Sequence, residues 1–252
     1  MLEFLKAPVE VFQEFILLSF RAIRNVFRSP HYADDIFHQM DVIGVGSLPI
    51  VSMVGFFSGI VMAMQMARAL TQYGATSQVG QIVSITLVRE LGPVLTALLV
   101  AGRNASGIAS ELGSMKVTEQ IDAMRALGTD PVQKLVTPRL IATAVVLPLL
   151  TIISDFIGLI GGFIIASTLL NITGSQYWTS AWQGTLEYND IAQGLIKPFA
   201  FAIVIALVGC FYGMRTTGGT QGVGRATTRA VVMSSVWIFV LTTLIGRLFV
   251  NI

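Results

Sequence analysis

The chain has one cysteine and two histidines among 252 residues, and charged side chains make up only 12% of it. A single cysteine excludes a disulfide framework, and so few sulfur and imidazole groups leave little for a metal site. The charged fraction is about half of the roughly 25% that soluble domains carry, which excludes a water-soluble enzyme. A net charge of +2 gives no reason to expect a nucleic-acid partner.

The hydrophobic residues, 54% of the chain, are grouped into long blocks that contain few charges. A helix needs about 20 residues to cross the hydrocarbon core of a bilayer. Two of the blocks are at the short end of the spanning range, and the third is long enough to tilt or to extend past the membrane. The sequence therefore predicts an all-α polytopic membrane protein with five spanning helices, over residues 43–67, 82–102, 140–170, 198–214 and 230–246.

The positions of the basic residues predict the orientation of the chain, because cytoplasmic loops carry an excess of lysine and arginine. With the N-terminus in the cytoplasm and the C-terminus in the periplasm, 12 of the 16 basic residues fall on the cytoplasmic side. These are Lys6, Arg21, Arg24, Arg28, Arg103, Lys116, Arg125, Lys134, Arg139, Arg215, Arg225 and Arg229. Arg68 and Arg247 lie near helix ends on the other side.

Residues 1–30 are predicted to form an amphipathic helix that lies in the membrane interface. At about 100° per residue, five large apolar side chains share one face, and the arginines are placed to meet anionic headgroups. The alternative is a cytosolic helix that packs on a partner. The apolar face consists of Phe12, Ile16, Phe20, Ile23 and Phe27.

The longest polar stretch, residues 103–139, is predicted to contain a short independent helix. Thr118 is expected to cap its N-terminus, and Gly128 is expected to end it in a left-handed conformation before Pro131. Its apolar stripe is too short to span a membrane and would dock a cytoplasmic partner, or else lie back on the membrane or on the helix bundle. The stripe consists of Val117, Ile121, Met124 and Leu127.

Residues 219–226 (GTQGVGRA) match the glycine spacing of a phosphate-binding loop but lack its chemistry. Arg225 replaces the lysine, and Ala226 replaces the hydroxyl that binds magnesium. Nucleotide hydrolysis is therefore expected on another chain. The glycines are expected to let a turn pass close to a neighbouring segment.

Charged residues inside spans are costly and are usually paired or functional. Arg89, Glu90 and Lys197 are expected to meet at one depth, where Glu90 pairs with Lys197 or Arg89 and leaves one cation for a lipid phosphate. The alternative is a charge cluster that only fastens two helices. No partner is predicted for Asp155.

The first span offers a candidate pocket for acyl chains, because methionine side chains adapt to irregular spaces; ordinary packing or a lipid-facing surface is the alternative. The residues at helical spacing are Met62, Gln65, Met66, Ala69 and Tyr73. The glycine pairs at 55 and 59 and at 158 and 162 allow close contact between helices, although such pairs are common in spans.

Six short motifs resemble those of the MlaE (YrbE) permeases, which are the membrane subunits of ABC transporters that work with MCE-domain proteins. The motifs are RELGP at 89–93, AGR at 101–103, ELGSM at 111–115, TEQ at 118–120, DP at 130–131 and GVGRATT at 222–228. They occur in the order and spacing of that family, and the resemblance covers the chain from about residue 43 onward. It implies a single permease domain over residues 1–252.

The resemblance implies a homodimer in the bacterial inner membrane that engages a cytoplasmic ATPase, which binds ATP and Mg²⁺. In many members a periplasmic hexamer of MCE-domain chains and a small STAS-domain protein complete the complex. The implied cargo is phospholipid, moved between the inner and outer membranes to maintain outer-membrane lipid asymmetry, with no catalytic or cofactor site on this chain. By motif match, the coupling region at 111–128 contains Glu111, Gly113, Met115, Glu119, Asp122 and Arg125.

Two other functions are weaker interpretations of the sequence. An intramembrane lipid-modifying enzyme would need converging nucleophiles, acid–base groups or metal ligands, and both His31 and His38 lie outside the spans. A secondary transporter often shows inverted repeats, which five spans without visible repetition disfavour.

Overall fold

The computed structural model describes residues 2–30, 32–182 and 188–250, which are mostly helical and contain no strand. Five long helical stretches in this part of the chain are apolar enough to cross a membrane, which confirms the predicted all-α polytopic fold. They are Ala33–Gln72, Thr76–Val117, Val132–Leu170, Tyr188–Met214 and Gly219–Phe249. Each predicted span lies inside one of these stretches, and each stretch is longer than the predicted block.

The extra length changes the interpretation of the polar stretch at 103–139. Hydropathy finds only the apolar part of a helix, whereas backbone hydrogen bonding continues into the polar turns at its ends. The second stretch continues to Val117 and the third begins at Val132. The polar stretch is therefore mostly helical, and only residues 118–131 separate the two long stretches.

The described helices include three π-helical turns. The α-helices are α1 (Leu2–Val26), α2 (Ala33–Gln72), α3 (Val79–Thr86), α4 (Gly92–Val100), α5 (Ser106–Val117), α6 (Gln120–Ala126), α7 (Thr137–Leu170), α8 (Gly174–Trp182), α9 (Tyr188–Met214) and α10 (Gly219–Val250). A 3₁₀ turn, η1 (Thr76–Gln78), precedes α3, and the π-helical turns are η2 (Leu87–Leu91), η3 (Ala101–Ala105) and η4 (Val132–Val136). Turns of this kind insert one residue into a helix and are frequent at functional sites.

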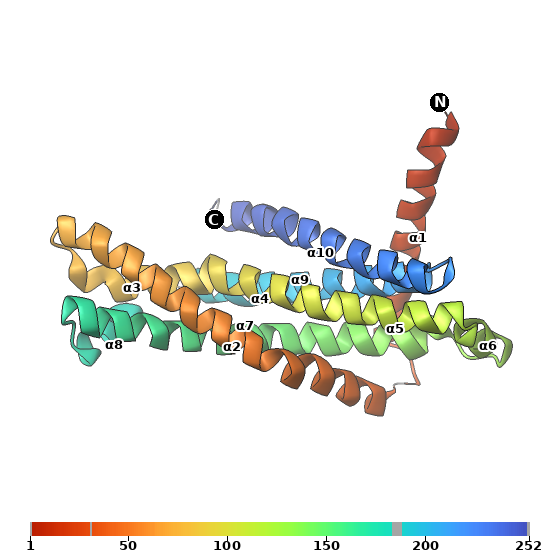
Figure 1. The fold of residues 1–252 in the computed structure, drawn as a ribbon, viewed down its shortest axis with the longest axis horizontal. Coiled ribbons are helices and arrows are strands. Elements are labelled where there is room, and N and C mark those ends of the chain that lie inside the picture. Colours follow the sequence, from red (N-terminus) through yellow and green to blue (C-terminus); the bar gives the residue numbers. More distant parts are fainter. Residues whose placement is uncertain (1, 31, 183–187, 251–252) are drawn as a thin grey trace. The chain divides into compact units, whose positions relative to one another are not determined.

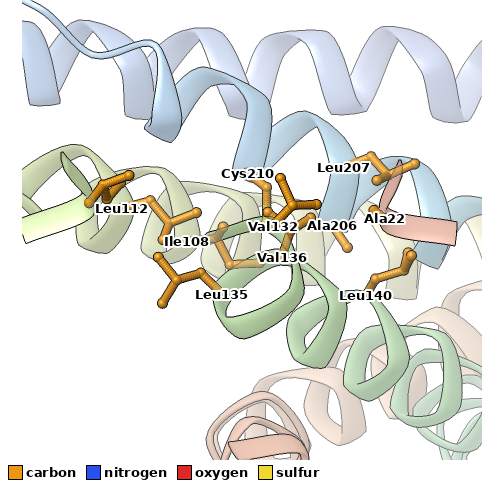
Figure 2. Close-up of a cluster of buried hydrophobic side chains, with 11 residues drawn as sticks. Ala22, Ile108, Leu112, Val132, Leu135, Val136, Leu140, Ala206, Leu207 and Cys210 are labelled. Atoms are coloured by element: carbon orange, nitrogen blue, oxygen red, sulfur yellow. The ribbon is translucent and has the colours of Figure 1, made fainter. Parts of the chain in front are cut away.

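The chain forms two compact units, and the first comprises Met1–Ile43, Ala101–Ala144 and Ala202–Val236. Its core gathers side chains from α1, α5, η4, α7 and α9, which converge in Figure 2, together with Ile121 of α6. The buried members are Ala22, Ile108, Leu112, Ile121, Val132, Leu135, Val136, Leu140, Ala206, Leu207 and Cys210. This core fixes both the N-terminal helix and the short helix α6 to one body.

Helix α1 packs on the first unit with one face and leaves the predicted apolar face uncovered. Phe15, Leu18 and Val26 pack against the core. The side chains of the other face are exposed, from 46% for Ile23 to 83% for Phe27. The exposed set contains the five residues that the periodicity predicts: Phe12, Ile16, Phe20, Ile23 and Phe27. The placement of this face in a membrane interface stays a prediction.

The second unit comprises Gly44–Val100, Val145–Phe201 and Trp237–Ile252. Helix α8 packs against α3 and lies beside it in Figure 1, and Tyr177 of α8 donates a hydrogen bond to the carbonyl oxygen of Leu159 (3.2 Å). Helices α2 and α7 approach so closely that a Cβ on Gly59 would overlap the carbonyl oxygen of Gly158. The predicted glycine pairs therefore do lie at a close helix contact, which small residues permit.

Candidate functional site

The turn between α5 and α6 is built differently from the prediction. The Thr118 hydroxyl donates a hydrogen bond to the carbonyl oxygen of Ser114 (2.9 Å), so Thr118 closes α5. Glu119 then precedes α6 with a φ of 61°, in the left-handed region that non-glycine residues seldom adopt. The prediction of Thr118 as the N-cap is wrong, because the chain reverses through a left-handed residue that makes no side-chain cap.

The end of α6 agrees with the prediction. Gly128 has a φ of 80°, and its N–H donates a hydrogen bond to the carbonyl oxygen of Arg125 (3.0 Å). Glycine takes this conformation without the steric cost that a Cβ would bring. Helix α6 is therefore a separate short helix that lies between α5 and the start of the third long stretch (Figure 1).

Some residues of the predicted apolar stripe are buried against the helix bundle, and others are exposed. Ile121 is fully buried and Met124 packs against the core of the first unit. This half of the stripe lies back on the helix bundle, as the alternative interpretation held. Leu127 is 83% exposed. Val117 is also exposed, but it is the last residue of α5 and not part of α6, so its place in the stripe was predicted wrongly. The stripe thus anchors α6 with its middle residues and leaves Leu127 on the surface.

Charged residues of α6 form exposed pairs with one another and with α5. The Asp122 carboxylate accepts a hydrogen bond from Lys116 (2.7 Å) and lies 3.3 Å from Arg125. The hydrogen bond from Lys116 lowers the pKa of Asp122 against an opposing effect of desolvation, and the positive charges of Lys116 and Arg125 lower it further. Exposed ion pairs contribute little to stability, so these charges remain available to a partner surface.

Three of the residues that the family resemblance assigns to coupling make contacts between α5 and the rest of the first unit, and their part in coupling stays a prediction. Glu111 lies 2.8 Å from Arg139, whose side chain is buried and also donates to the carbonyl oxygen of Leu135 (2.6 Å). Gly113 is buried against Thr216, and Met115 packs on the core. Four members of the set are exposed: Glu111, Glu119, Asp122 and Arg125.

The charged residues inside the spans form two ion pairs in the second unit. Glu90 pairs with Lys197 (2.6 Å), as predicted, and Arg89 pairs with Asp190. The expectation of an unmatched cation is therefore wrong, because each cation has its own carboxylate. The sequence did not predict Asp190 as a partner of Arg89, because the fourth span was expected to begin at Pro198. Helix α9 begins earlier, at Tyr188.

The π-helical turn η2 explains how Lys197 is held. Lys197 is fully buried and donates a second hydrogen bond to the carbonyl oxygen of Arg89 (2.8 Å), inside that turn. A π-helical turn leaves a carbonyl without its usual partner in the helix. Burial of an ammonium group is tolerated only with such partners. The α9 glycine at 194 packs on η2 at Val88, which brings α9 against this turn.

An apolar groove of about 570 Å³ lies between α2 and the α3–α4 segment in the second unit. Met62 and Gln65 line this groove, whereas Met66 is half-buried elsewhere and Ala69 and Tyr73 are exposed outside it. The lining residues are Met53, Val54, Phe57, Ser58, Val61, Met62, Gln65, Thr86, Leu91 and Leu95. The pocket is therefore displaced by about two turns toward the N-terminus of α2, relative to the predicted one.

Asp155 of α7 is buried directly against Gly92, where a Cβ would overlap its carboxylate. Its Oδ1 atom has no hydrogen-bond partner among the residues that the structure describes. A carboxylate in a span is costly without a partner. Gly92 follows η2 directly, so Asp155 packs on the same segment that carries Arg89 and Glu90.

A family model described as "Permease MlaE" matches residues 36–248, which include the charge cluster, the groove and α6. The chain belongs to the MlaE permease family. A relative from Rickettsia typhi, named a probable ABC transporter permease protein, is 43% identical over 234 residues, which cover 93% of this chain and 90% of the relative.

Two other relatives carry names that mention the cargo or the compartment. The intermembrane phospholipid transport system permease protein MlaE of Haemophilus influenzae is 36% identical over 211 residues, or 82% of this chain and 80% of that protein. The chloroplastic protein TRIGALACTOSYLDIACYLGLYCEROL 1 of Arabidopsis thaliana is 36% identical over 84% of this chain and 60% of its own length. The family model and each of these relatives match most of the length of this chain.

Proposed function

We propose that this MlaE-family permease moves phospholipid between the inner and outer membranes as the membrane subunit of an ABC transporter, and so maintains outer-membrane lipid asymmetry. The observation that carries the proposal is the apolar groove on α2, whose wall continues into the segment with the two ion pairs. The printed name of the Haemophilus influenzae relative supports phospholipid as the cargo. In this proposal the acyl chains occupy the groove.

The ion pairs of the second unit would receive the polar headgroup. Glu90 is about half exposed, at 49% of its side chain, and Arg89 is 39% exposed, while their partners Lys197 and Asp190 are buried. A phosphate that approaches Arg89 can replace Asp190 as its partner by a bidentate contact. The headgroup would then bind because Arg89 exchanges Asp190 for the phosphate, and no unpaired cation is needed.

Energy for transport would come from a separate cytoplasmic ATPase that binds ATP and Mg²⁺. The outward face of α6, with Glu119, Asp122, Arg125 and Leu127, offers that ATPase a charged surface with one apolar side chain. The buried residues beneath it, Ile121 and Met124, would transmit the movement of the helix into the core. We take Glu111, Gly113 and Met115 as the residues that keep α5 rigid for this purpose.

The family assignment and the charge pattern support a proposal for the wider assembly. We propose a homodimer in the bacterial inner membrane, with its N-terminus in the cytoplasm and its C-terminus in the periplasm. A periplasmic hexamer of MCE-domain chains and a STAS-domain protein that binds the ATPase would complete it.

The proposal predicts that a bulky side chain in the groove blocks transport. Val61 lines the groove and is 50% exposed, so Val61→Trp should fill it without disturbing the core. We expect the rate of fluorescent phospholipid transfer by the reconstituted complex to fall about tenfold, the equivalent of about 1.4 kcal/mol of lipid binding. ATPase binding should not change, because Val61 lies outside the first unit.

Val240→Trp is the matched control, because Val240 is 40% exposed on α10 and does not line the groove. Equal transport rates for Val61→Trp and the wild type would contradict the groove as the lipid path. Transport that persists without any ATPase would instead favour a secondary transporter.

A further inference from the structure

A second, polar cavity of about 470 Å³ lies in the first unit, apart from the groove and the ion pairs used above. Its walls come from α1, the end of α9, the turn at 215–218 and the start of α10. Three arginines line it: Arg215, Arg225 and Arg229. The remaining lining residues are Val11, Phe211, Tyr212, Thr216, Thr217, Gly222 and Ala226.

The turn that brings these arginines together requires glycine. A Cβ on Gly222 would overlap the carbonyl oxygen of Thr217, and Gly218 has a φ of 87°. This close approach lies within the turn itself, so the passage of the turn near a neighbouring segment stays a prediction. Gly218 and Gly219 both have a positive φ, so glycine at these two positions lets the chain turn from the end of α9 into the start of α10, which gathers the three guanidinium groups.

The cavity carries more positive charge than its own surroundings neutralise. Arg215 lies 3.2 Å from Glu14 and over the ring of Phe211. Arg225 and Arg229 are exposed, and neither has a carboxylate within salt-bridge distance among the residues that the structure describes. The N-terminal turn of α10 adds a partial positive charge at the same place. A cavity of this kind selects an anion with several oxygen acceptors.

The surroundings of the cavity indicate that the anion belongs to a lipid. On α10, exposed apolar side chains begin one turn after Arg229, at Val232, Met233 and Val236. On α1, Val11 lines the cavity and its neighbour Phe12 starts the exposed apolar face. Arginines at such a boundary between polar and apolar surface lie at the depth of lipid headgroups.

We propose that this cavity binds the phosphate group of an anionic phospholipid, held by Arg225 and Arg229 with Arg215 beside them. The lipid stays bound at this site and is distinct from the cargo in the groove, so the proposal does not depend on the transport function. Its acyl chains lie along the exposed apolar residues of α1 and α10. The bound lipid joins the N-terminal helix to the last span.

The test compares the full-length protein in nanodiscs of phosphatidylcholine alone with nanodiscs that also contain phosphatidylglycerol. Native mass spectrometry counts retained phosphatidylglycerol, and thermal unfolding measures the stabilisation that this lipid gives. Arg225→Gln/Arg229→Gln should bind it roughly 30-fold more weakly, since each basic residue near an anionic surface contributes a factor of about five. Arg247→Gln, at the other end of α10, is the matched control and should bind it as the wild type does.

Three outcomes overturn the proposal. Retention of phosphatidylglycerol by the double glutamine variant would show that the arginines do not hold it. Equal stabilisation by inorganic phosphate in phosphatidylcholine nanodiscs would assign the cavity to a free anion. A double variant that keeps the lipid but no longer binds the ATPase would assign the cavity to a protein contact.

If the glutamine variant does not fold, Arg225→Lys/Arg229→Lys keeps the charge and should retain weakened binding of phosphatidylglycerol. Unweakened binding would contradict a bidentate contact between the arginines and the phosphate.

Discussion

Glycines on α2 determine how closely this helix can approach α7. Gly55 lies against the backbone and hydroxyl of Ser154, and Gly59 lies against the backbone of Gly158. In a membrane, helices gain little from the hydrophobic effect when they associate, because lipid tails are also apolar. Close packing of backbones therefore carries more of the stability here than it would in a soluble protein.

Gly59→Ala should destabilise the second unit by about 1–3 kcal/mol, because the added methyl group cannot fit without moving α2 away from α7. Thermal unfolding of the purified protein measures the loss. Gly246→Ala is the matched control, since no atom lies within 4 Å of the position its Cβ would take. Similar unfolding temperatures for the two variants would argue that the helices can separate at little cost.

Single residues also mark the limit of what the sequence could predict about the site. The pairing of Glu90 with Lys197 follows from their opposite charges at one expected depth, and the structure bears it out. The pair of Arg89 with Asp190 was missed. Asp190 and Lys197 are seven residues apart, which places them on one face of α9, but this pattern is visible only if the helix is known to continue before Pro198. The predicted block began directly after the charge of Lys197, although the helix continues through that residue.

Among the elements, α6 has the clearest division between an anchored and an exposed side. Ile121 is fully buried, whereas Leu127, on the next turns of the same stripe, is 83% exposed. Hydrophobic periodicity predicts that the four apolar residues share a face. It does not tell which part of that face meets the helix's own bundle, because the answer depends on where the neighbouring helices end.

Leu127→Asp should weaken binding of the ATPase by about tenfold or more, as expected when an apolar anchor at the centre of an interface is lost. The fold should not change, because the side chain does not contact the core. Pull-down of the ATPase and thermal unfolding measure the two effects separately.

Tyr188→Asp provides the control for Leu127→Asp, because Tyr188 is 88% exposed at the start of α9, on the side that the charge pattern predicts to be periplasmic. It should bind the ATPase as the wild type does. Ile121→Asp should instead unfold at lower temperature, since it buries a charge in the core. Unweakened ATPase binding by Leu127→Asp would remove the outward end of α6 from the contact.

The lengths of the elements were less predictable than their number. The five apolar blocks correspond to the five long helical stretches. A block must be long enough to cross the hydrocarbon core, so its length and composition identify it. The π-helical turns η2, η3 and η4 have no signature in hydropathy, since one inserted residue shifts the phase of a helix without changing its composition. The turn η2 nevertheless provides the carbonyl oxygen that Lys197 uses.

At the scale of the whole molecule, the distribution of the basic residues is the main basis for the predicted orientation of the chain in the membrane. All but four of the 16 fall on one predicted side, and the three arginines of the proposed lipid cavity belong to that group. A bilayer with anionic lipids on its cytoplasmic face attracts such residues by about 1 kcal/mol each. The predicted orientation and the proposed lipid site therefore support each other, and an inverted orientation would weaken both.

Single-cysteine labelling in spheroplasts tests this orientation. Cys210 is fully buried, so the wild type should not react with a membrane-impermeant maleimide and serves as the background. Thr173→Cys, in the exposed turn between α7 and α8, should be labelled in intact spheroplasts because that turn is predicted to face the periplasm. Thr220→Cys, exposed at the start of α10, should be labelled only after permeabilisation. Both variants should react fully in detergent, and the reverse pattern in intact spheroplasts would place the arginine cavity on the periplasmic side.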